Sequence, residues 1–375
     1  MVGLSVAYHL ADLGLADVVV LEREPAAGSG STGRCAGGIR IQFSSEVNAR
    51  LSAWSLEFLK SFKARTGVDP GLRQYGYLIV TRDPATLAEF EANVAMQRAL
   101  GLRVRLVTPA EAGAIVPQLY TADLAGGTFG PDDGYADPHS VVQGLVAAIR
   151  RMGVRLFTDA EVVGLEVAGG QVQAVRVRGR GGTEGWCIET TCVVNAAGPW
   201  AAEVARLAGV ELPVRPFRRM VFVTEPVAGF APDLPMVIDF DTGFYARREG
   251  DRLIFGMANE REGPSFRTDV DWSFLPQVLE KGVHRLPSLA EARVARGWAG
   301  LYEMSPDHNA IVGQAPGVSG LFFANGFSGH GFQQAPAVGR VLAEMILGLA
   351  PSIDVSALSP QRFQAGRPHV ERRVI

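Results

Sequence analysis

The feature that most constrains the fold is a helix-and-strand pattern within the first 22 residues. Apolar residues from Leu4 to Leu13 recur at helical spacing, and Gly14 stands where a glycine would end the helix. The apolar run Val18 to Leu21 is typical of a strand buried on both faces of a parallel sheet, and Glu22 follows it. With Gly3, this pattern matches the second half of a dinucleotide-binding fold, in which the glycine allows tight packing and the acid binds a ribose.

The alternative is a buried helix–strand pair that ends in an acid by chance. A complete dinucleotide-binding pattern would also have a first strand and two more glycines ahead of Met1. We therefore expect the chain to be truncated at its N-terminus, or its start to have been assigned too late.

A second segment, Gly28 to Arg40, is rich in glycine and small polar residues. Its free backbone N–H groups would allow close approach to a phosphate or a flat ring. A flexible linker is the alternative, but Arg34, Ile39 and Arg40 interrupt the low-complexity pattern that a linker would have. A binding role is favoured.

Composition excludes several classes of protein. A chain of 375 residues with 47% hydrophobic and 20% charged residues is typical of a globular protein of two packed domains. The net charge of −3 gives no reason to expect nucleic acid as a partner, and no apolar run is long enough for a transmembrane segment. Three cysteines, Cys35, Cys187 and Cys192, argue against a disulfide framework and a metal site. We expect a cytoplasmic protein with no export signal.

The remaining pattern predicts an α/β fold of two interleaved domains. The segment 121–137 reads as turn-like, 214–255 as several antiparallel strands, and the part after Gly297 as short elements. Helices are expected at 47–64, 84–100, 109–115, 138–152 and 335–347, strands at 74–81, 154–157, 192–197 and 320–325, and a hairpin at 162–167 and 172–177.

Two later motifs complete the evidence for a family. They read Val193-Val-Asn-Ala-Ala-Gly198-Pro-Trp200 and Asn325-Gly-Phe-Ser-Gly-His-Gly-Phe332. With Gly3 and Val19-Val-Leu-Glu22 they make the chain, over nearly its whole length, resemble the FAD-dependent amine and amino-acid oxidoreductases typified by sarcosine oxidase, glycine oxidase and D-amino-acid oxidase. The stretch from Arg34 to Phe43 is also similar to the β subunits of dye-linked proline dehydrogenases and sarcosine oxidases.

The resemblance implies a Rossmann-like FAD-binding domain and an antiparallel-sheet substrate domain. We expect the first to comprise 1–70, 136–212 and 295–375, and the second 71–135 and 213–294. The implied FAD-binding residues are Gly3, Glu22, Arg23, Ser31, Thr32, Arg34, Cys35, Gly37, Gly38, Ile39, Val162, Ala197, Gly198, Trp200, Gly326, Phe327, Ser328, Gly329, His330, Gly331 and Phe332.

The glycine-rich turn from Gly326 to Phe332 also has a physical argument of its own. Donors at a helix N-terminus, aimed at the N1–C2=O edge of the flavin, would stabilise the anionic reduced ring. Taken alone, the same glycines would equally suit a sharp turn between a strand and a helix.

The resemblance also implies the chemistry. Arg40 falls where the sarcosine oxidase pattern has an arginine that binds the substrate carboxylate, although a surface or flavin-neighbouring arginine is the alternative. His330, Tyr245 and Tyr302 are candidates for the wall on which the amine lies, although a lone histidine such as His330 is more often a structural turn residue. The expected reaction is hydride transfer from a small secondary, tertiary or cyclic amino acid, such as sarcosine, dimethylglycine or proline, to FAD.

The chain departs from the family pattern at several positions. Gln333 replaces a lysine, and Gly300 falls where sarcosine oxidase has the cysteine that tethers its flavin, so we expect non-covalent FAD. The position of the substrate-wall histidine falls near Ala258. Near His139, where heterotetrameric relatives tether a second flavin, a helix-capping Pro-His pair is favoured.

Other functions stay open at this stage. The chain could be an FAD-binding assembly or scaffold subunit that does no catalysis, or an FAD-dependent hydroxy-acid or glycerol-phosphate dehydrogenase of related fold. For the latter, Arg215, Arg218 and Arg219 are the candidate phosphate-binding cluster, unless they form a solvated loop. The electron acceptor would be O2 or a partner protein, and membership of a hetero-oligomer is a further alternative.

Overall fold

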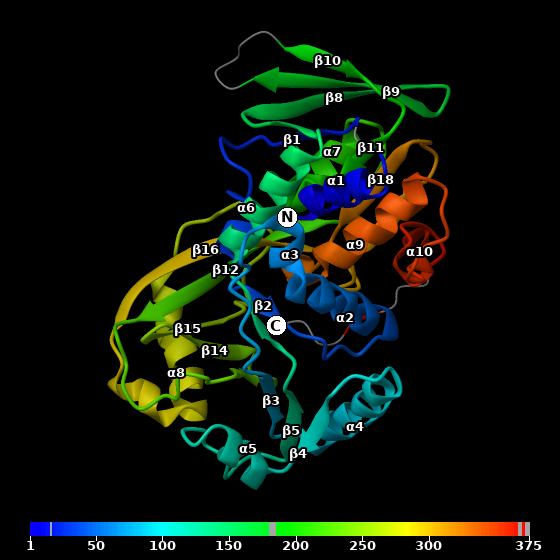
Figure 1. The fold of residues 1–375 in the computed structure, drawn as a ribbon. Coiled ribbons are helices and arrows are strands. Elements are labelled where there is room, and N and C mark those ends of the chain that lie inside the picture. Colours follow the sequence, from blue (N-terminus) through cyan, green and yellow to red (C-terminus); the bar gives the residue numbers. More distant parts are fainter. Residues whose placement is uncertain (16, 180–184, 367–369, 372–375) are drawn as a thin grey trace.

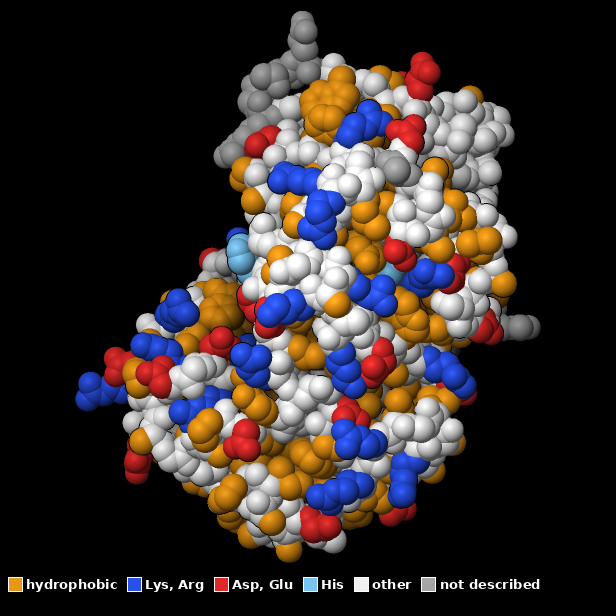
Figure 2. Space-filling model, in the orientation of Figure 1, with side chains coloured by type: hydrophobic (Ala, Val, Ile, Leu, Met, Phe, Trp, Pro, Cys, Tyr) orange, Lys and Arg blue, Asp and Glu red, His pale blue; other side chains and the backbone are white. Residues whose placement is uncertain are grey.

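The computed structural model describes residues 1–15, 17–179, 185–366 and 370–371 (Figure 1). In Figure 1 a small sheet lies at the top, a layer of helices and short parallel strands lies below it, and a large sheet with its own helices forms the base. Charged side chains of both signs are interspersed over the face shown in Figure 2. No helix in the described ranges is both long and apolar enough to cross a bilayer.

The middle layer joins the two ends of the chain. Strand β1 (Val19–Leu21) pairs in parallel with β7 (Arg155–Phe157), and β11 (Val193–Asn195) pairs in parallel with β18 (Leu321–Asn325). Strand β17 (Ile311–Gln314) pairs antiparallel with β18. Helices α1 (Val2–Asp12) and α9 (Gly331–Ile346), from opposite ends of the sequence, pack side by side. Segments far apart in the sequence therefore meet in one layer.

The uppermost sheet confirms the predicted hairpin. Strands β8 (Ala160–Ala168) and β9 (Gln171–Gly179) pair antiparallel, and β10 (Trp186–Glu189) pairs with β9. Gly169 and Gly170 make the turn with φ of 57° and 75°, a conformation that favours glycine. Strand β8 has a register shift between Val162 and Gly164, at the point where it faces the middle layer.

The base of the molecule is a mixed sheet of eight strands. The order is β16-β12-β15-β14-β13-β3-β5-β4, and only the β13–β3 pair is parallel within it. Its apolar core includes Phe222, Phe244 and Phe255, which are fully buried. The strands are β3 (Tyr77–Thr81), β4 (Arg105–Val107), β5 (Gly126–Gly130), β12 (Arg215–Thr224), β13 (Met236–Asp239), β14 (Phe244–Glu249), β15 (Arg252–Met257) and β16 (Val294–Met304).

The other elements cover these sheets. A short pair, β2 (Gly38–Ile39) and β6 (Gly134–Tyr135), links the middle layer to the base. The remaining helices are α2 (Glu46–Lys60), α3 (Phe62–Thr66), α4 (Pro84–Ala99), α5 (Pro109–Ile115), α6 (Pro138–Arg151), α7 (Ala201–Arg206), α8 (Leu275–Arg285) and α10 (Gln361–Gln364).

Two predictions about elements are wrong. The segment 121–137 is not turn-like, because it contains β5 and β6, and its glycines lie in strands where neighbouring backbone leaves no room for a side chain. The stretch from Gly297 to Met304, where short elements were predicted, lies within β16, an 11-residue strand whose burial does not alternate, so period-2 patterning could not reveal it. The next element, β17, has four residues and is short, as predicted. In addition, the helix predicted at 47–64 ends at Lys60 and resumes at Phe62, and α9 begins at Gly331, not at residue 335.

Candidate functional site

A cavity of about 980 Å³ lies between the middle layer and the two sheets. Its walls include the start of α1, the end of β1, the segment from Ala27 to Arg40, the end of β11 and the start of α9. One end reaches Val162 on β8, and another reaches Ile238 on β13 in the large sheet. The cavity therefore runs from the top layer to the base.

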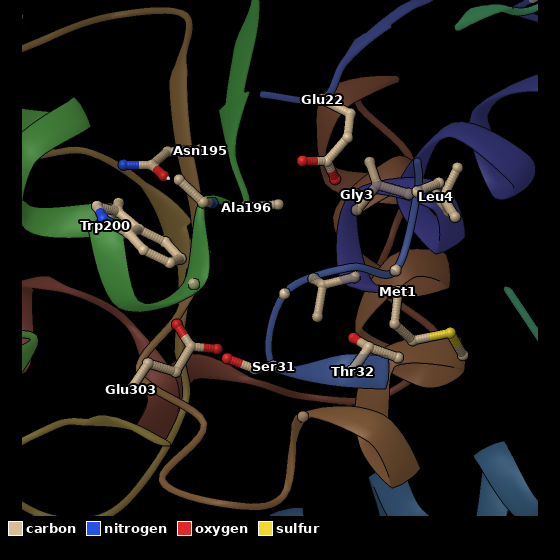
Figure 3. Close-up of a pocket in the computed structure, with 18 of the residues that line it drawn as sticks. Met1, Gly3, Leu4, Glu22, Ser31, Thr32, Asn195, Ala196, Trp200 and Glu303 are labelled. Atoms are coloured by element: carbon tan, nitrogen blue, oxygen red, sulfur yellow. Dashed lines mark hydrogen bonds between the residues drawn. The ribbon is translucent and has the colours of Figure 1, made fainter. Parts of the chain in front are cut away.

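The part of the cavity near α1 has the features expected for a nucleotide. A Cβ added to Gly3 would lie 3.4 Å from the Cβ of Ala196, so the helix start packs closely on the end of β11. No side chain caps the first turn of α1, so the N–H groups of this turn have no side-chain partner. The residues of this turn line the cavity. Glu22 ends β1 beside it, and Figure 3 shows Gly3 and Glu22 on one side of an open space and Asn195 and Ala196 on the other.

A 3-10 turn at Thr32–Arg34 closes a second wall. The Ser31 Oγ atom is buried, and no described group forms a hydrogen bond with it. The Glu303 side chain points toward Ser31 in Figure 3, and Glu303 Oε2 accepts a hydrogen bond from the Gly326 N–H at 3.0 Å. Burial raises the pKa of Glu303 to about 8, although the N–H groups of Gly326 and Phe327 lower it. This carboxyl group therefore carries a proton at neutral pH.

The turn after β11 is shaped by its own side chain. Asn195 Nδ2 donates to the Ala201 carbonyl at 2.9 Å, and its Oδ1 accepts from the Ala197 N–H at 3.1 Å. Gly198 has a φ of 56° in this turn. Two residues after Gly198, the Trp200 ring lies under the Arg23 guanidinium, and the Arg23 Cζ atom is 4.0 Å from a Trp200 ring centroid.

Arg40 is a buried cation in a second part of the cavity, and its exposed fraction is 4%. Its Nη1 donates to the Gln42 carbonyl at 3.0 Å, and its Nη2 lies 3.1 Å from His330 Nε2. The guanidinium also lies over the Phe43 ring at 4.4 Å. Burial lowers the pKa of Arg40, while nearby Glu371 and Tyr77 raise it. These contacts fix the direction of the guanidinium, which stays charged because arginine titrates far above neutral pH.

The segment that follows β2 and carries Arg40 is held by a buried acid. Asp133 is fully buried, and its two oxygens accept from the Ile41 N–H and from Gln42 Nε2, both at 2.7 Å. Burial raises the pKa of Asp133 to about 7, and the hydrogen bonds from Gln42 and Ile41 lower it. The Arg40 N–H donates to Gln333 Oε1 at 2.7 Å. Gln333, which replaces the lysine of the family pattern, thus ties β2 to α9.

Three tyrosines from the large sheet line the same part of the cavity: Tyr77 on β3, Tyr245 on β14 and Tyr302 on β16. Burial raises the pKa of all three hydroxyls, so each is a neutral donor or acceptor at physiological pH. Tyr302 lies against Gly329, which has a φ of 97° and whose added Cβ would collide with the ring. The glycine in this turn therefore allows the sheet to approach α9.

Most residues predicted to form the site are brought together. Only Ile39, Gly326 and Ser328 do not line the cavity: Ile39 is buried in the core, Gly326 lies in the turn after β18, and Ser328 Oγ donates to the Gly326 carbonyl. Those that line it are Gly3, Glu22, Arg23, Ser31, Thr32, Arg34, Cys35, Gly37, Gly38, Arg40, Val162, Ala197, Gly198, Trp200, Tyr245, Tyr302, Phe327, Gly329, His330, Gly331 and Phe332.

The wall residues that sequence reasoning missed include Tyr77, Met236, Ile238 and Glu303. Tyr77 and Met236 lie opposite one another on neighbouring strands, a pairing that no local pattern reveals. The signal available for Glu303 was its place three residues after Gly300 and two residues before Ser305-Pro306-Asp307.

Three positions bear on whether a flavin could be attached covalently: Cys35, Gly300 and His139. Cys35 lines the cavity, but burial raises the pKa of its thiol to about 11, which keeps it protonated and unreactive. A Cβ at Gly300 would lie 3.0 Å from the Arg34 Cβ, so the wall here is closed by Arg34. His139 is exposed, outside the cavity, in the first turn of α6, which Asp137 caps.

The described residues fit FAD in both shape and chemistry. The cavity is long, with an acid at the end of β1 for a ribose and the unpaired Ser31 Oγ and the uncapped start of α1 for phosphates. Its far end is lined by aromatic rings and the Arg40 guanidinium. Within the described ranges, no group of three metal-ligating side chains is found.

Comparisons with known proteins agree with this geometry. The family model described as DAO, FAD dependent oxidoreductase, matches residues 1–345. A bovine (Bos taurus) FAD-dependent oxidoreductase domain-containing protein 1 is 35% identical over an alignment of 417 positions, which covers all of this chain and 85% of that protein. Human mitochondrial sarcosine dehydrogenase is 31% identical, over 96% of this chain but 40% of its own length.

Solved structures give the same result. The crystal structure of L-proline dehydrogenase from P. horikoshii matches with a TM-score of 0.89 and 32% identity, over 97% of this chain and 96% of that one. The agreement extends over both the middle layer and the large sheet.

Proposed function

The chain belongs to the DAO family of FAD-dependent oxidoreductases, and from this we propose that it oxidises the carbon–nitrogen bond of a small secondary, tertiary or cyclic amino acid. Candidate substrates are sarcosine, dimethylglycine, proline and glycine-like compounds. Bound FAD would supply the acceptor for the hydride that leaves the carbon next to nitrogen. Water would then hydrolyse the resulting imine.

The observation that carries this proposal is the buried Arg40 guanidinium. Among its contacts, those to the Gln42 carbonyl and to His330 Nε2 orient the planar guanidinium at the cavity wall. A guanidinium in this setting binds a carboxylate far better than it binds a neutral group. We infer that Arg40 holds the carboxylate of the substrate, and that Tyr245, Tyr302 and His330 surround the amine.

The origin of the wall residues supports the proposed division of the chain. Segments 71–135 and 213–294 supply Tyr77, Met236, Ile238 and Tyr245, all on the side where Arg40 lies. The segments 1–70, 136–212 and 295–375 supply the start of α1, the end of β1 and the two glycine-rich turns. We propose that the first group forms the substrate domain and the second the FAD domain.

An anaerobic titration of the holoprotein tests the proposal. Sarcosine, dimethylglycine, proline or glycine should bleach the absorbance of the oxidised flavin, and a 2-hydroxy acid or glycerol phosphate should not. The Arg40→Lys variant should require roughly 100-fold more of the same amino acid for half-bleaching, because one cation remains but the planar fork is lost. Arg50→Gln, an exposed change on α2, is the control.

Other outcomes would contradict the proposal in different ways. A flavin that no amine reduces would favour a scaffold subunit that binds FAD without catalysis. Bleaching by hydroxy acids alone would favour a dehydrogenase of the other class. Reoxidation of the bleached protein by air, compared with reoxidation by an artificial dye, would separate O2 from a partner protein as the electron acceptor. A cytoplasmic location stays a prediction.

A further inference from the structure

A second arginine lines the cavity, and its environment lacks an anion. Arg219 lies on β12, on the same face as Val221, and both line the cavity. Its register partner on β16 is Gly300, which has no side chain to cover it. The guanidinium therefore projects from the floor of the large sheet into the space that Tyr302 and Arg40 also line.

The contacts of Arg219 leave its charge unbalanced. Its Nη1 donates to the Arg218 carbonyl at 2.9 Å, and its Cζ lies 5.2 Å from the Tyr302 ring centroid. The Nε atom is buried, and among the described residues it has no hydrogen-bond partner. No carboxylate in the described ranges forms an ion pair with Arg219.

Glu262 and Asp269 already pair with another arginine, Arg218, and Glu260 forms no ion pair with Arg219 in the described ranges. Glu262 lies 2.8 Å from Arg218 Nε, and Asp269 lies 3.0 Å from Arg218 Nη1. Burial lowers the pKa of Arg219, while Tyr302, Glu262 and Glu260 raise it. An arginine keeps its charge even so, and a partly buried charge without a partner is costly. Such a group is retained where a ligand supplies the opposite charge.

Tyr302 connects this site to Arg40. Burial raises the pKa of the Tyr302 hydroxyl, and the charges of both Arg219 and Arg40 lower it, so both guanidiniums act on the same phenol. Two cations therefore flank one tyrosine at one end of the cavity. Met236, Ile238 and Tyr245 form the wall of this space that comes from the large sheet, and none of them carries a charge at neutral pH.

We propose that Arg219 is a specificity-determining residue that binds a second carboxylate, so that the preferred substrate is a dicarboxylic secondary amine. This inference rests on the proposed amine oxidation: Arg40 holds the carboxylate next to the reacting carbon, and Arg219 holds the carboxylate at the far end of the substrate. The second carboxylate belongs either to the substituent on nitrogen or to the side chain of the amino acid.

Matched substrates test the proposal on the holoprotein. N-carboxymethylglycine and N-methylglycine differ by one carboxylate on the nitrogen substituent, and N-methylaspartate and N-methylalanine differ by one on the side chain. We expect kcat/KM to be at least about 30-fold higher for the dicarboxylate of one of these pairs. A preference within the first pair would place the second carboxylate on the nitrogen substituent, and a preference within the second pair would place it on the side chain of the amino acid.

The variant Arg219→Gln should abolish that preference, bringing the ratio of kcat/KM within the pair close to one, and Arg219→Lys should retain part of it. Arg215→Gln, an exposed arginine on the same strand, is the matched control and should leave the ratio unchanged. Equal kcat/KM for both members of each pair in the unaltered protein would overturn the proposal. So would an Arg219→Gln variant that keeps the preference or loses both activities equally.

A binding measurement separates this inference from the proposed function. Thiodiacetate and methylthioacetate carry sulfur in place of the amine, so they cannot form an imine, and their affinities can be measured by calorimetry. Thiodiacetate should bind the holoprotein at least about 30-fold more tightly, and Arg219→Gln should remove the difference. If no amine reduces the flavin but this difference is found, the amine oxidation fails and the anion site stands. If amines reduce the flavin but no difference is found, the anion site fails alone.

Discussion

At the scale of single residues, Gly38 and Tyr77 illustrate how closely the cavity wall is packed. A Cβ added to Gly38 would collide with the Tyr77 hydroxyl, and both residues line the cavity. The absence of a side chain at Gly38 is therefore what allows the phenol to stand beside Arg40. The position is determined by a neighbour from a distant strand, not by the local turn.

We expect Gly38→Ala to displace Tyr77 and to lower kcat/KM by roughly 10- to 100-fold, because small misplacements at a reacting centre are costly. The double variant Gly38→Ala with Tyr77→Phe removes the colliding oxygen, so it should recover to the level of Tyr77→Phe alone. Steady-state kinetics on the four proteins test this. Additive losses in the double variant would show that the collision is not the cause.

Asp133 gives a prediction about pH. Its pKa in the folded protein is raised to about 7, so the folded state binds a proton that an unfolded aspartate has released. Stability should therefore fall as pH rises from about 4 to about 7. Asp133→Asn removes this titration, so its melting temperature relative to the unaltered protein should rise over that interval, by a few degrees in all.

Thermal melts at several pH values measure this difference. Asp233→Asn is the matched control, since Asp233 is exposed and does not act on the pKa of Asp133. A difference between Asp133→Asn and the unaltered protein that stays constant from pH 4 to pH 8 would show that Asp133 is ionised throughout.

At the scale of elements, one side chain makes several ion pairs with the long segment 258–271, which lies between β15 and α8. Arg218 on β12 has an exposed fraction of 2% and pairs with Glu262 and Asp269 of this segment. The segment carries Phe266 onto the Trp200 ring, with ring centroids 5.3 Å apart. A strand of the large sheet thus places a loop against the turn that follows β11.

Arg218→Met should free this segment and leave Glu262 without its partner, with an expected loss of about 3 kcal/mol in the free energy of unfolding. Limited proteolysis should then cut within 258–271 faster than in the unaltered protein. Arg215→Met, at the exposed start of the same strand, should change neither quantity. Unchanged cutting in Arg218→Met would mean that the loop is held by its other contacts.

Elements also show which parts of the molecule could be predicted from the sequence. The hairpin at β8 and β9 and the start of α6 were predictable, because their turn and cap residues are local signals. Strand β16 was not predictable in this way. One part of the strand is exposed, one part is buried and one part borders the cavity, so its side chains do not alternate between buried and exposed. Arg219 was noticed only as a member of an arginine cluster, since its place opposite Gly300 depends on the register of two distant strands.

At the scale of the whole molecule, the cavity is the junction of all three layers. Its walls come from α1, β1, β8, β11 and α9, and from five strands of the large sheet, β3, β12, β13, β14 and β16. A ligand that fills it contacts segments from all three layers at once. FAD should therefore act as a structural component as well as a reagent.

We expect FAD to be held without a covalent bond, because Gly300 offers no side chain and the Cys35 thiol is kept protonated. Acid precipitation of the holoprotein should release all of the flavin into the supernatant. Restoring FAD to the flavin-free protein at about 100 times its dissociation constant should add about 2.7 kcal/mol to its stability. Flavin that stays with the precipitated protein would contradict the prediction.

The pairing of the two ends of the chain has a consequence for how the protein is made. Strand β18 and helix α9 leave the ribosome long after α1 and β1, yet all of them line or support the cavity. A nascent chain that has not yet reached Gly331 carries Glu22 and Asn195 but lacks the helix that packs against α1. Loading of the coenzyme is therefore a late event in biosynthesis, and the supply of free flavin matters most after synthesis is nearly finished.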